Sequence, residues 1–128
     1  MNWNEAIYHL NSKPKVNYKD IGYYLSEYAN QYGLTTKNAQ ASFLANLMQE
    51  TDNLNSLEEY ASGSAYEGRA DLGNIYPGDG KKFKGRGGLM TTGRANYEAV
   101  SKHIFKDTRL LDNPEILATP KYAVLSSL

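Results

Sequence analysis

Residues 39–51 read AQASFLANLMQET, and this stretch predicts the helix on which the rest of the fold depends. Its apolar side chains recur at the spacing of one helix face, and Thr35 or Thr36 supplies a hydroxyl that can cap the start. The apolar face consists of Ala39, Phe43, Leu44, Leu47 and Met48. A helical turn of about 100° per residue places Glu50 roughly 60° from Leu47. We therefore expect Glu50 at the helix end and partly buried, which would favour its protonated form.

Helical spacing also appears before and after this stretch. Residues 2–10 predict a short helix, with Trp3, Ala6, Ile7 and Leu10 on one side. A second helix begins at Asn17 and ends before Gly33, and its apolar stripe is Ile21, Tyr24, Leu25, Tyr28 and Tyr32. The helical period returns at Tyr97, Val100, Ser101 and Ile104. Asn113-Pro114-Glu115 has the residues of a helix start, and Pro120 separates that short helix from a last one.

The middle of the chain is different. Residues 63–93 contain nine glycines and one proline, a density that argues against a long helix or a regular sheet. Aromatic and apolar residues are interspersed among these glycines, so we interpret the segment as a packed functional loop rather than a linker. The predicted fold class is therefore mainly α, with a glycine-rich irregular or small β element in the middle.

Length and composition favour one folded domain over residues 1–128. The chain has no cysteine, which excludes disulfide scaffolds, thiolate metal sites and cysteine nucleophiles. Net charge is zero, but residues 1–80 carry 10 acids and 5 bases whereas residues 81–128 carry 4 acids and 9 bases. One interpretation is an acidic cleft wall that faces a basic one, and chance segregation is the other. No signal peptide, transmembrane stretch or membrane anchor is expected.

Several kinds of site are disfavoured. His9 and His103 are far apart and form no metal-binding pattern, so no metal site is predicted. The glycine-rich basic run 78–88 matches neither phosphate-loop pattern, and no cofactor is implied. Its cations make nucleic-acid contact an alternative, but a solvated turn is the simpler interpretation and no nucleic-acid partner is predicted.

Carboxylates are more informative. Glu58 and Glu59 follow Glu50 after a polar segment whose length allows a turn, so a second carboxylate can face Glu50 across a groove. Two carboxylates in unlike surroundings are what glycosidic-bond hydrolysis requires, since one donates a proton and the other activates water. Spacing alone is equally compatible with solvated glutamates. Among the eleven tyrosines, Tyr60, Tyr66 and Tyr76 are the candidate wall residues for a saccharide groove.

Three stretches together carry a family resemblance. They are residues 43–51, residues 66–80, and residues 83–97, which include Gly85-Arg86-Gly87 and Thr92-Gly93-Arg94-Ala95-Asn96-Tyr97. In order and spacing the chain resembles glycoside hydrolase family 19, in the phage endolysin and lysozyme-like branch related to plant chitinases. The similarity spans about residues 38–125.

The resemblance implies a lysozyme-like helical fold and hydrolysis of β-1,4 links in an N-acetylhexosamine polymer with inversion. Glu50 then matches the general acid and Glu59 the base. Thr92 matches a hydroxyl residue that helps to hold the water. The remaining implied groove positions are Asn96 and Tyr97, with Gly85, Arg86 and Gly87 on the groove floor. An ion pair between Glu67 and Arg69 would brace the cleft, and substrate contact is the alternative for both.

The chain also departs from the family pattern. Gln49 replaces a histidine before the acid, Asp52-Asn53 replaces a glycine-containing pair after it, and Met90 replaces a groove glutamine. Family members continue beyond the position of Leu128 through a further helical lobe, so we expect a domain that lacks this C-terminal lobe. A partner chain that supplies the lobe, or a natural truncation, are the two explanations.

The leading hypothesis is an endolysin-like muramidase that acts on peptidoglycan and stays in the host bacterial cytoplasm until it is released to the cell wall. A catalytically impaired relative that binds glycan or a protein partner is the first alternative, and a chitinase is the second. Catalysis is assigned to Glu50 and Glu59. The predicted substrate-binding residues are Tyr60, Tyr66, Glu67, Arg69, Arg86, Thr92, Asn96 and Tyr97.

Overall fold

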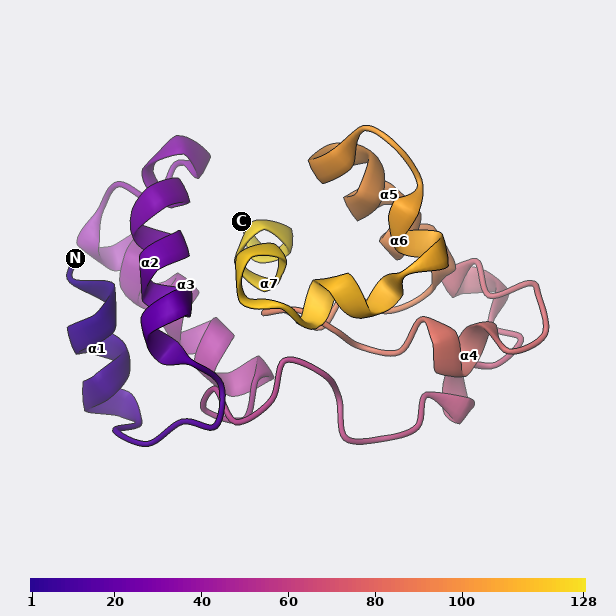
Figure 1. Cartoon of the computed structure of the whole chain (residues 1–128), viewed down its shortest axis with the longest axis horizontal. Coiled ribbons are helices and arrows are strands. Elements are labelled where there is room, and N and C mark those ends of the chain that lie inside the picture. The colour runs from indigo at the N-terminus through magenta and orange to yellow at the C-terminus, as the bar shows by residue number, and fades with distance from the viewer.

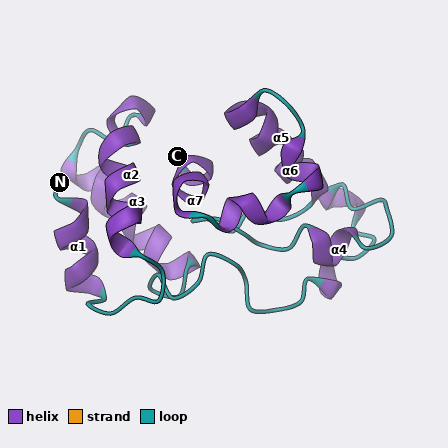
Figure 2. Cartoon of the chain, viewed as in Figure 1, coloured by secondary structure: helices purple, strands orange, loops and turns teal.

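The computed structural model describes all residues 1–128, which form a mainly helical molecule without a β-strand (Figures 1 and 2). The α-helices are α1 (Trp3–Leu10), α2 (Tyr18–Tyr28), α3 (Lys37–Glu50), α4 (Asp79–Lys82), α5 (Arg94–Phe105), α6 (Arg109–Asp112) and α7 (Pro120–Ser127). Short 3-10 helices occupy η1 (Asn30–Tyr32), η2 (Ser64–Tyr66), η3 (Ala70–Leu72) and η4 (Pro114–Ala118). No helix has the length and apolar character needed to cross a membrane.

The first three helices begin where the sequence places caps. The side chains of Asn2, Asn17 and Thr36 each accept a backbone N–H from the first turn of the helix that follows. Such bonds satisfy donors that have no partner inside the helix. The predicted helix over 2–10 and the predicted helix opened by Thr35 or Thr36 are therefore confirmed as α1 and α3.

The second helix differs from its prediction at the C-terminal end. Helix α2 ends at Tyr28, and a 3-10 turn carries the chain to Gly33, whose φ of +86° is left-handed. Tyr32 therefore leaves the apolar stripe and is exposed. Leu10, predicted on the apolar side of the first helix, is likewise 57% exposed. The start of η4 also differs, because Asn113 makes no side-chain capping bond.

Two separate hydrophobic clusters hold the molecule together. The larger cluster joins α1, α2, α3, the turn after α3, and α7. Its buried members are Trp3, Ile7, Ile21, Leu25, Ala29, Leu44, Leu47, Met48, Leu54, Leu57, Ala123 and Val124. The smaller cluster is Phe83, Tyr97, Leu110 and Leu117, from the loop before α5 and from α5, α6 and η4. Figure 1 shows α7 lying between the α1–α3 group and α5.

The glycine-rich middle of the chain is irregular, which is one of the two forms that the sequence predicts for it. Its ordered pairing is limited to isolated bridges between Glu58 and Arg86 and between Arg86 and Thr91. Gly88 explains how this loop reaches between helices. A Cβ there would lie 2.6 Å from Leu47 Cδ1 on α3 and 2.3 Å from Ser127 Oγ on α7, so a side chain cannot be accommodated without displacement.

A buried ion pair fixes the loop before α4 to the start of α5. Asp79 is 2% exposed, and its two oxygens accept from Arg94 Nε at 2.8 Å and from a terminal guanidinium nitrogen at 2.9 Å. The guanidinium also lies over the rings of Tyr76 and Phe83. Hydrogen bonds from Arg94 lower the pKa of Asp79. This bidentate pair therefore holds one side of the loop rigid.

Candidate active site

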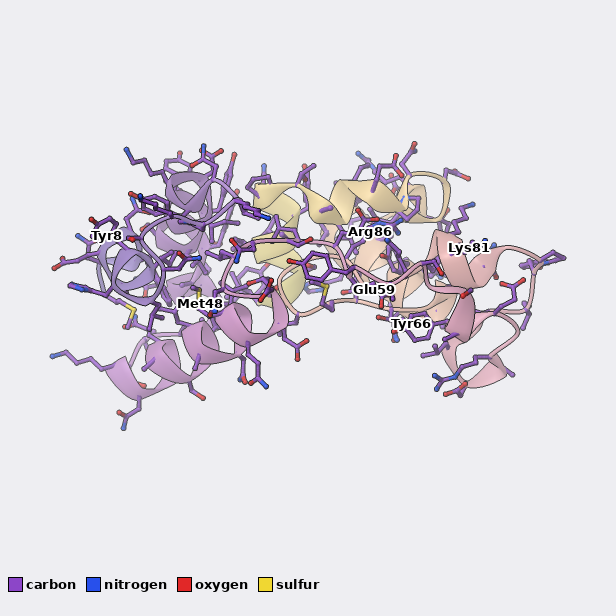
Figure 3. The ribbon with its side chains drawn as sticks, turned by 90° about the horizontal axis from the view of Figure 1, so that it is seen from below. Tyr8, Met48, Glu59, Tyr66, Lys81 and Arg86 are labelled. Carbon is purple, nitrogen blue, oxygen red and sulfur yellow. The ribbon has the colours of Figure 1, made fainter.

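A cavity of about 520 Å³ lies where the end of α3 meets the segment that follows it and the glycine-rich loop. Both predicted catalytic carboxylates, Glu50 and Glu59, line it. The other lining residues are Gln49, Thr51, Asp52, Ser56, Glu58, Tyr60, Tyr66, Gly85, Met90 and Thr92. Figure 3 shows Glu59, Tyr66 and Arg86 close together, away from Tyr8 and Met48 of the α1–α3 group.

Glu50 is the last residue of α3, and the end of this helix is locally determined. The Thr51 hydroxyl donates to the Leu47 carbonyl at 2.7 Å and accepts the Leu54 N–H at 3.0 Å, so it closes the last turn. Glu50 itself is exposed and has no hydrogen-bond or ion-pair partner within the protein. The predicted partial burial is therefore wrong, because the side chain points into the open cavity rather than against the apolar face.

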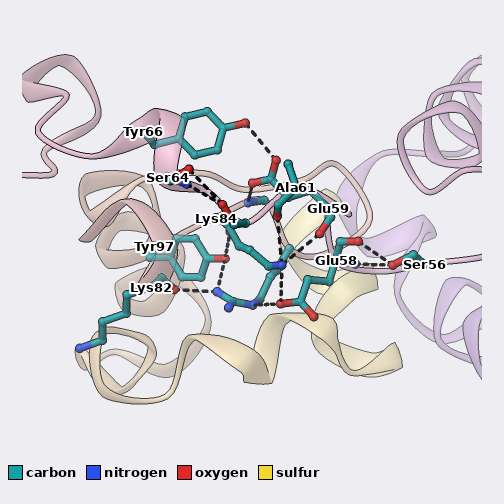
Figure 4. A network of polar contacts seen from close by, with 12 residues as sticks. Ser56, Glu58, Glu59, Ala61, Ser64, Tyr66, Lys82, Lys84 and Tyr97 are labelled. Carbon is teal, nitrogen blue, oxygen red and sulfur yellow. Dashed lines mark hydrogen bonds and ion pairs between the residues drawn. The ribbon is translucent and has the colours of Figure 1, made fainter. Parts of the chain in front are cut away.

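Glu59 has the opposite surroundings. Its Oε1 accepts the Gly85 N–H at 2.5 Å, and its Oε2 accepts the Tyr66 hydroxyl at 3.1 Å (Figure 4). The backbone N–H of Glu59 in turn donates to the Gly85 carbonyl at 2.9 Å. Burial and the hydrogen bond to Glu59 raise the pKa of Tyr66, so the phenol keeps its proton and remains a donor. The carboxylate is thus half-buried and fixed in orientation from two sides.

Beneath Glu59, two cations hold its neighbour Glu58. Glu58 Oε1 lies 3.3 Å from Lys84 Nζ and 3.2 Å from Arg86 Nε. Lys84 Nζ also donates to the carbonyls of Glu59 and Ala61, which ties this segment down along its length (Figure 4). The sequence did not predict this partner of Glu58, because the isolated β-bridge that aligns Glu58 with Arg86 joins residues that are 28 positions apart.

Arg86 does not reach the cavity, so its predicted substrate contact is not supported by the structure. Its side chain is 11% exposed and also donates to the Lys82 carbonyl at 2.7 Å and to the Tyr97 hydroxyl at 3.2 Å. The charged lining residues of the cavity are Glu50, Asp52, Glu58 and Glu59. The interpretation of an acidic cleft wall that faces a basic one is therefore wrong, because Lys84 and Arg86 lie behind the carboxylates rather than opposite them.

Thr92 lies beside Glu59 across Gly85. Thr92 Oγ1 and Glu59 Oε1 are each 3.4 Å from the point that a Cβ on Gly85 would occupy. Thr92 lines the cavity, and its hydroxyl donates to the Met90 carbonyl at 2.9 Å, so its oxygen can still accept a hydrogen bond. The Thr92 hydroxyl therefore lies near the Glu59 carboxylate.

The two residues that follow on α5 differ from their predicted groove positions. Tyr97 is fully buried in the smaller core cluster, and its hydroxyl donates to the Lys84 carbonyl, so it is a core residue rather than a substrate contact. Burial raises the pKa of Tyr97 to about 12. Asn96 is exposed outside the cavity lining, where its amide donates to the Thr92 carbonyl at 2.8 Å. Both residues therefore support the loop that carries the site.

Glu67 and Arg69 do not form the predicted ion pair. Glu67 instead accepts the N–H groups of Gly78 and Gly80, each at 2.8 Å, and these bonds lower its pKa. Arg69 pairs with Asp71 at 2.6 Å on the surface. Neither residue lines the cavity, so Glu67 braces the loop before α4 and Arg69 lies outside the site.

The aromatic wall residues separate into two groups. Tyr60 and Tyr66 line the cavity as predicted, whereas Tyr76 is exposed elsewhere under the Arg94 guanidinium. Sequence reasoning missed Asp52, whose Oδ2 accepts the Tyr60 hydroxyl at 2.7 Å. The sequence did contain one signal for this position, since Asp52-Asn53 stands where the family pattern has a glycine-containing pair. Both residues have left-handed backbone angles, which glycine adopts most easily.

Other cavities and clusters offer less chemistry. A cavity of about 690 Å³ between α1 and α3 is lined mainly by apolar residues and holds one carboxylate, Asp52, which it shares with the candidate site. No group of three or more histidine, aspartate or glutamate side chains is arranged to hold a metal ion. The candidate site therefore remains the cavity that contains Glu50 and Glu59.

No protein-family model matches the chain. Three solved structures with a similar fold are chitinases. Chitinase C from Streptomyces griseus HUT6037 aligns with a TM-score of 0.72 and 22% identity, over 97% of this chain and 62% of that chain. A mutant of chitinase C aligns with a TM-score of 0.71 and 21% identity, over 97% and 51%. A bacterial family 19 chitinase gives 0.71 and 21%, over 97% and 63%.

These likenesses confirm the predicted mainly helical fold, which this chain shares with a bacterial family 19 chitinase. The chain spans less than two thirds of the length of each of these three chitinases. At such identities the likeness describes the backbone arrangement, and the chemistry has to be argued from the site itself.

Proposed function

We propose that this chain is a glycoside hydrolase that cleaves β-1,4 links in an N-acetylhexosamine polymer with inversion. The observation that carries the proposal is that Glu50 and Glu59 line one cavity in unlike surroundings. Glu59 is fixed by two hydrogen-bond donors, whereas Glu50 is exposed and unpaired. Inverting hydrolysis needs one carboxyl group for each of two tasks, with room for a water between them.

Glu50 is the proposed general acid. A saccharide in the cavity would cover its carboxyl group and exclude water from it, which favours the neutral form that donates a proton to the leaving oxygen. Because the last turn of α3 is closed by Thr51, the backbone beneath Glu50 is fixed and its side chain is directed at the cavity.

Glu59 is the proposed general base. The Gly85 N–H and the Tyr66 hydroxyl each donate to one of its oxygens, so both oxygens retain a further lone pair for a water. The Thr92 hydroxyl, on the other side of Gly85, would help to hold the same water, a role supported by its closeness to Glu59. The water would attack the anomeric carbon from the face opposite the leaving group, and Glu59 would take its proton.

Peptidoglycan is the proposed polymer, supported by the resemblance of residues 66–80 to the endolysin loop. Chitin is the second candidate, supported by the names of the solved structures with the same fold. Both polymers present N-acetylhexosamine units joined by β-1,4 bonds, so the same two carboxylates serve either substrate.

An impaired relative that binds glycan without cleaving it is a further candidate. Met90 lines the cavity where the family pattern has a glutamine, so a donor and acceptor for a sugar amide are absent at that position. The chain also spans 62% of the length of chitinase C.

Clearing of outer-membrane-permeabilised bacteria tests the proposal, with chitin oligomers digested in parallel. The parent chain is expected to clear the suspension or cleave the oligomers, and Glu50→Gln to lose at least about 100-fold in rate. Glu115→Gln, at an exposed carboxylate outside the cavity, is the matched control. Binding to either glycan without release of reducing ends would favour the impaired relative, and folded parent protein that neither binds nor cleaves would overturn the proposal.

A further inference from the structure

Three consecutive residues after α3 have left-handed backbone angles. The φ values are +52° at Asp52, +57° at Asn53 and +60° at Leu54. Residues other than glycine adopt the left-handed backbone conformation at a cost in free energy, and consecutive left-handed residues are rare. Such strain persists where surrounding contacts enforce it, and it is concentrated at functional sites.

Two of the three residues, Asn53 and Leu54, lie outside the lining of the candidate site. Leu54 is fully buried in the larger core cluster, so its side chain is required. The Asn53 carbonyl accepts the Asn11 side-chain amide at 2.7 Å, a bond that does not depend on the residue type at 53. Asp52 is exposed, and its side chain has one partner within the protein, the Tyr60 hydroxyl at 2.7 Å. At position 52, glycine would be free of strain and would lose that one contact.

The hydrogen bond between Tyr60 and Asp52 joins the two segments that carry Glu50 and Glu59. Asp52 lies two residues after Glu50, and Tyr60 directly follows Glu59. Both side chains line the cavity, yet Tyr60 is 72% exposed. A tyrosine so exposed would sample several rotamers, and the hydrogen bond to Asp52 restricts it to one. The same bond raises the pKa of Tyr60, which therefore stays a donor across the physiological range.

We propose that Asp52 is a positioning residue that holds the Tyr60 ring as a stacking platform for one sugar of the glycan, beside the base Glu59. Sugar rings present C–H faces that pack on aromatic rings, and an exposed ring fixed in advance binds with a smaller loss of entropy. The inference rests on the proposed function. It adds to that function a contact between one sugar ring and Tyr60, which depends on the hydrogen bond from Tyr60 to Asp52.

Binding of a β-1,4-linked N-acetylglucosamine tetramer and of a peptidoglycan-derived tetrasaccharide tests the inference, by calorimetry in the Glu50→Gln background. Tyr60→Ala removes the ring and is expected to weaken binding about 10-fold. Tyr60→Phe and Asp52→Gly keep the ring but free it, and each is expected to weaken binding about 3-fold. Asp52→Asn keeps an acceptor oxygen and should bind like the background protein.

Asn53→Gly is the matched control, because it relieves neighbouring strain and leaves the Asp52–Tyr60 pair intact. With an active Glu50, the three variants that weaken binding, Tyr60→Ala, Tyr60→Phe and Asp52→Gly, should raise KM and leave kcat within about 2-fold. A fall in kcat at unchanged KM would overturn the inference, since the bond would then set the separation of the two carboxylates. Unchanged binding in Tyr60→Ala would overturn the inference alone, and absence of binding by the background protein would overturn both proposals.

Discussion

Glu59 and Gly85 form a reciprocal pair, in which each backbone N–H donates to the other residue: Glu59 N–H to the Gly85 carbonyl at 2.9 Å, and Gly85 N–H to the Glu59 carboxylate at 2.5 Å. The pair orients the carboxylate through main-chain groups. One of the two hydrogen bonds that fix the Glu59 carboxylate therefore does not depend on any other side chain of the cavity, whereas the second comes from the Tyr66 hydroxyl.

Glu59→Gln is expected to retain the fold and lose activity. The glutamine amide oxygen can still accept the Gly85 N–H, so the melting temperature should stay within about 2 °C of the parent value. The rate of glycan cleavage should fall at least about 100-fold, because an amide cannot take a proton from water. A Gln variant that cleaves at the parent rate would contradict the assignment of Glu59 as the base.

Asp79→Asn is expected to lower the free energy of unfolding by about 3 kcal/mol at pH 7, because it leaves a largely buried Arg94 guanidinium without its carboxylate. Arg94 holds the folded pKa of Asp79 below its ordinary 3.8. The pair therefore stabilises the protein above that pH, and its contribution is lost as the pH falls through the folded value.

Denaturant unfolding at several pH values measures this effect. The parent protein should lose stability below about pH 4, and Asp79→Asn should lose less over the same range. Asp71→Asn breaks the exposed pair with Arg69 and should change little, since surface ion pairs contribute weakly. Equal effects of the two substitutions would contradict a special role for the Asp79–Arg94 pair.

Tyr97 is expected to titrate near pH 12, above the ordinary pKa of 10.0, because burial opposes its ionisation. The folded pKa exceeds the ordinary 10.0, so the stabilisation is complete below pH 10 and is lost as the pH rises through the folded value. Phenolate absorbance followed with pH should show one late step that Tyr97→Phe abolishes. The Phe variant should also lose about 1–2 kcal/mol, since the Lys84 carbonyl loses a donor.

Arg86→Gln is expected to lower the melting temperature by about 5 °C and leave KM unchanged. The substitution removes the guanidinium that joins Glu58, the Lys82 carbonyl and the Tyr97 hydroxyl. Lys81→Gln removes an exposed cation from the same basic run and is the comparison variant. A higher KM at an unchanged melting temperature would instead place Arg86 in the substrate groove.

Local signals predicted the helical part of the fold well. Asn17 and Thr36 were recognisable as caps because the caps depend on residues two or three positions away. The stripe with Tyr97, Val100 and Ser101 likewise indicated a buried helix face, and the structure buries Tyr97 as that pattern requires. Family resemblance placed the same tyrosine in the groove, so in this case periodicity was the better guide to burial.

Of the predicted site residues, the structure brings together in one cavity Glu50, Glu59, Tyr60, Tyr66 and Thr92, but the contacts that support them were not predicted. Glu67 bonds to Gly78 and Gly80, whose N–H groups converge because of the intervening loop conformation. No spacing rule anticipates such convergence across 11 and 13 residues. The exposure of Glu50 was missed for a related reason, since a helical wheel describes one helix and not the open space in front of its end.

The position of α7 has a consequence for the order of assembly. Ala123 and Val124 complete the cluster around α1, α2 and α3, although the glycine-rich segment and the smaller cluster separate them in the chain. On the ribosome the first three helices emerge well before the residues that seal them. During that interval their apolar faces stay open to chaperones and to one another, and the cluster closes only when α7 reaches α1, α2 and α3.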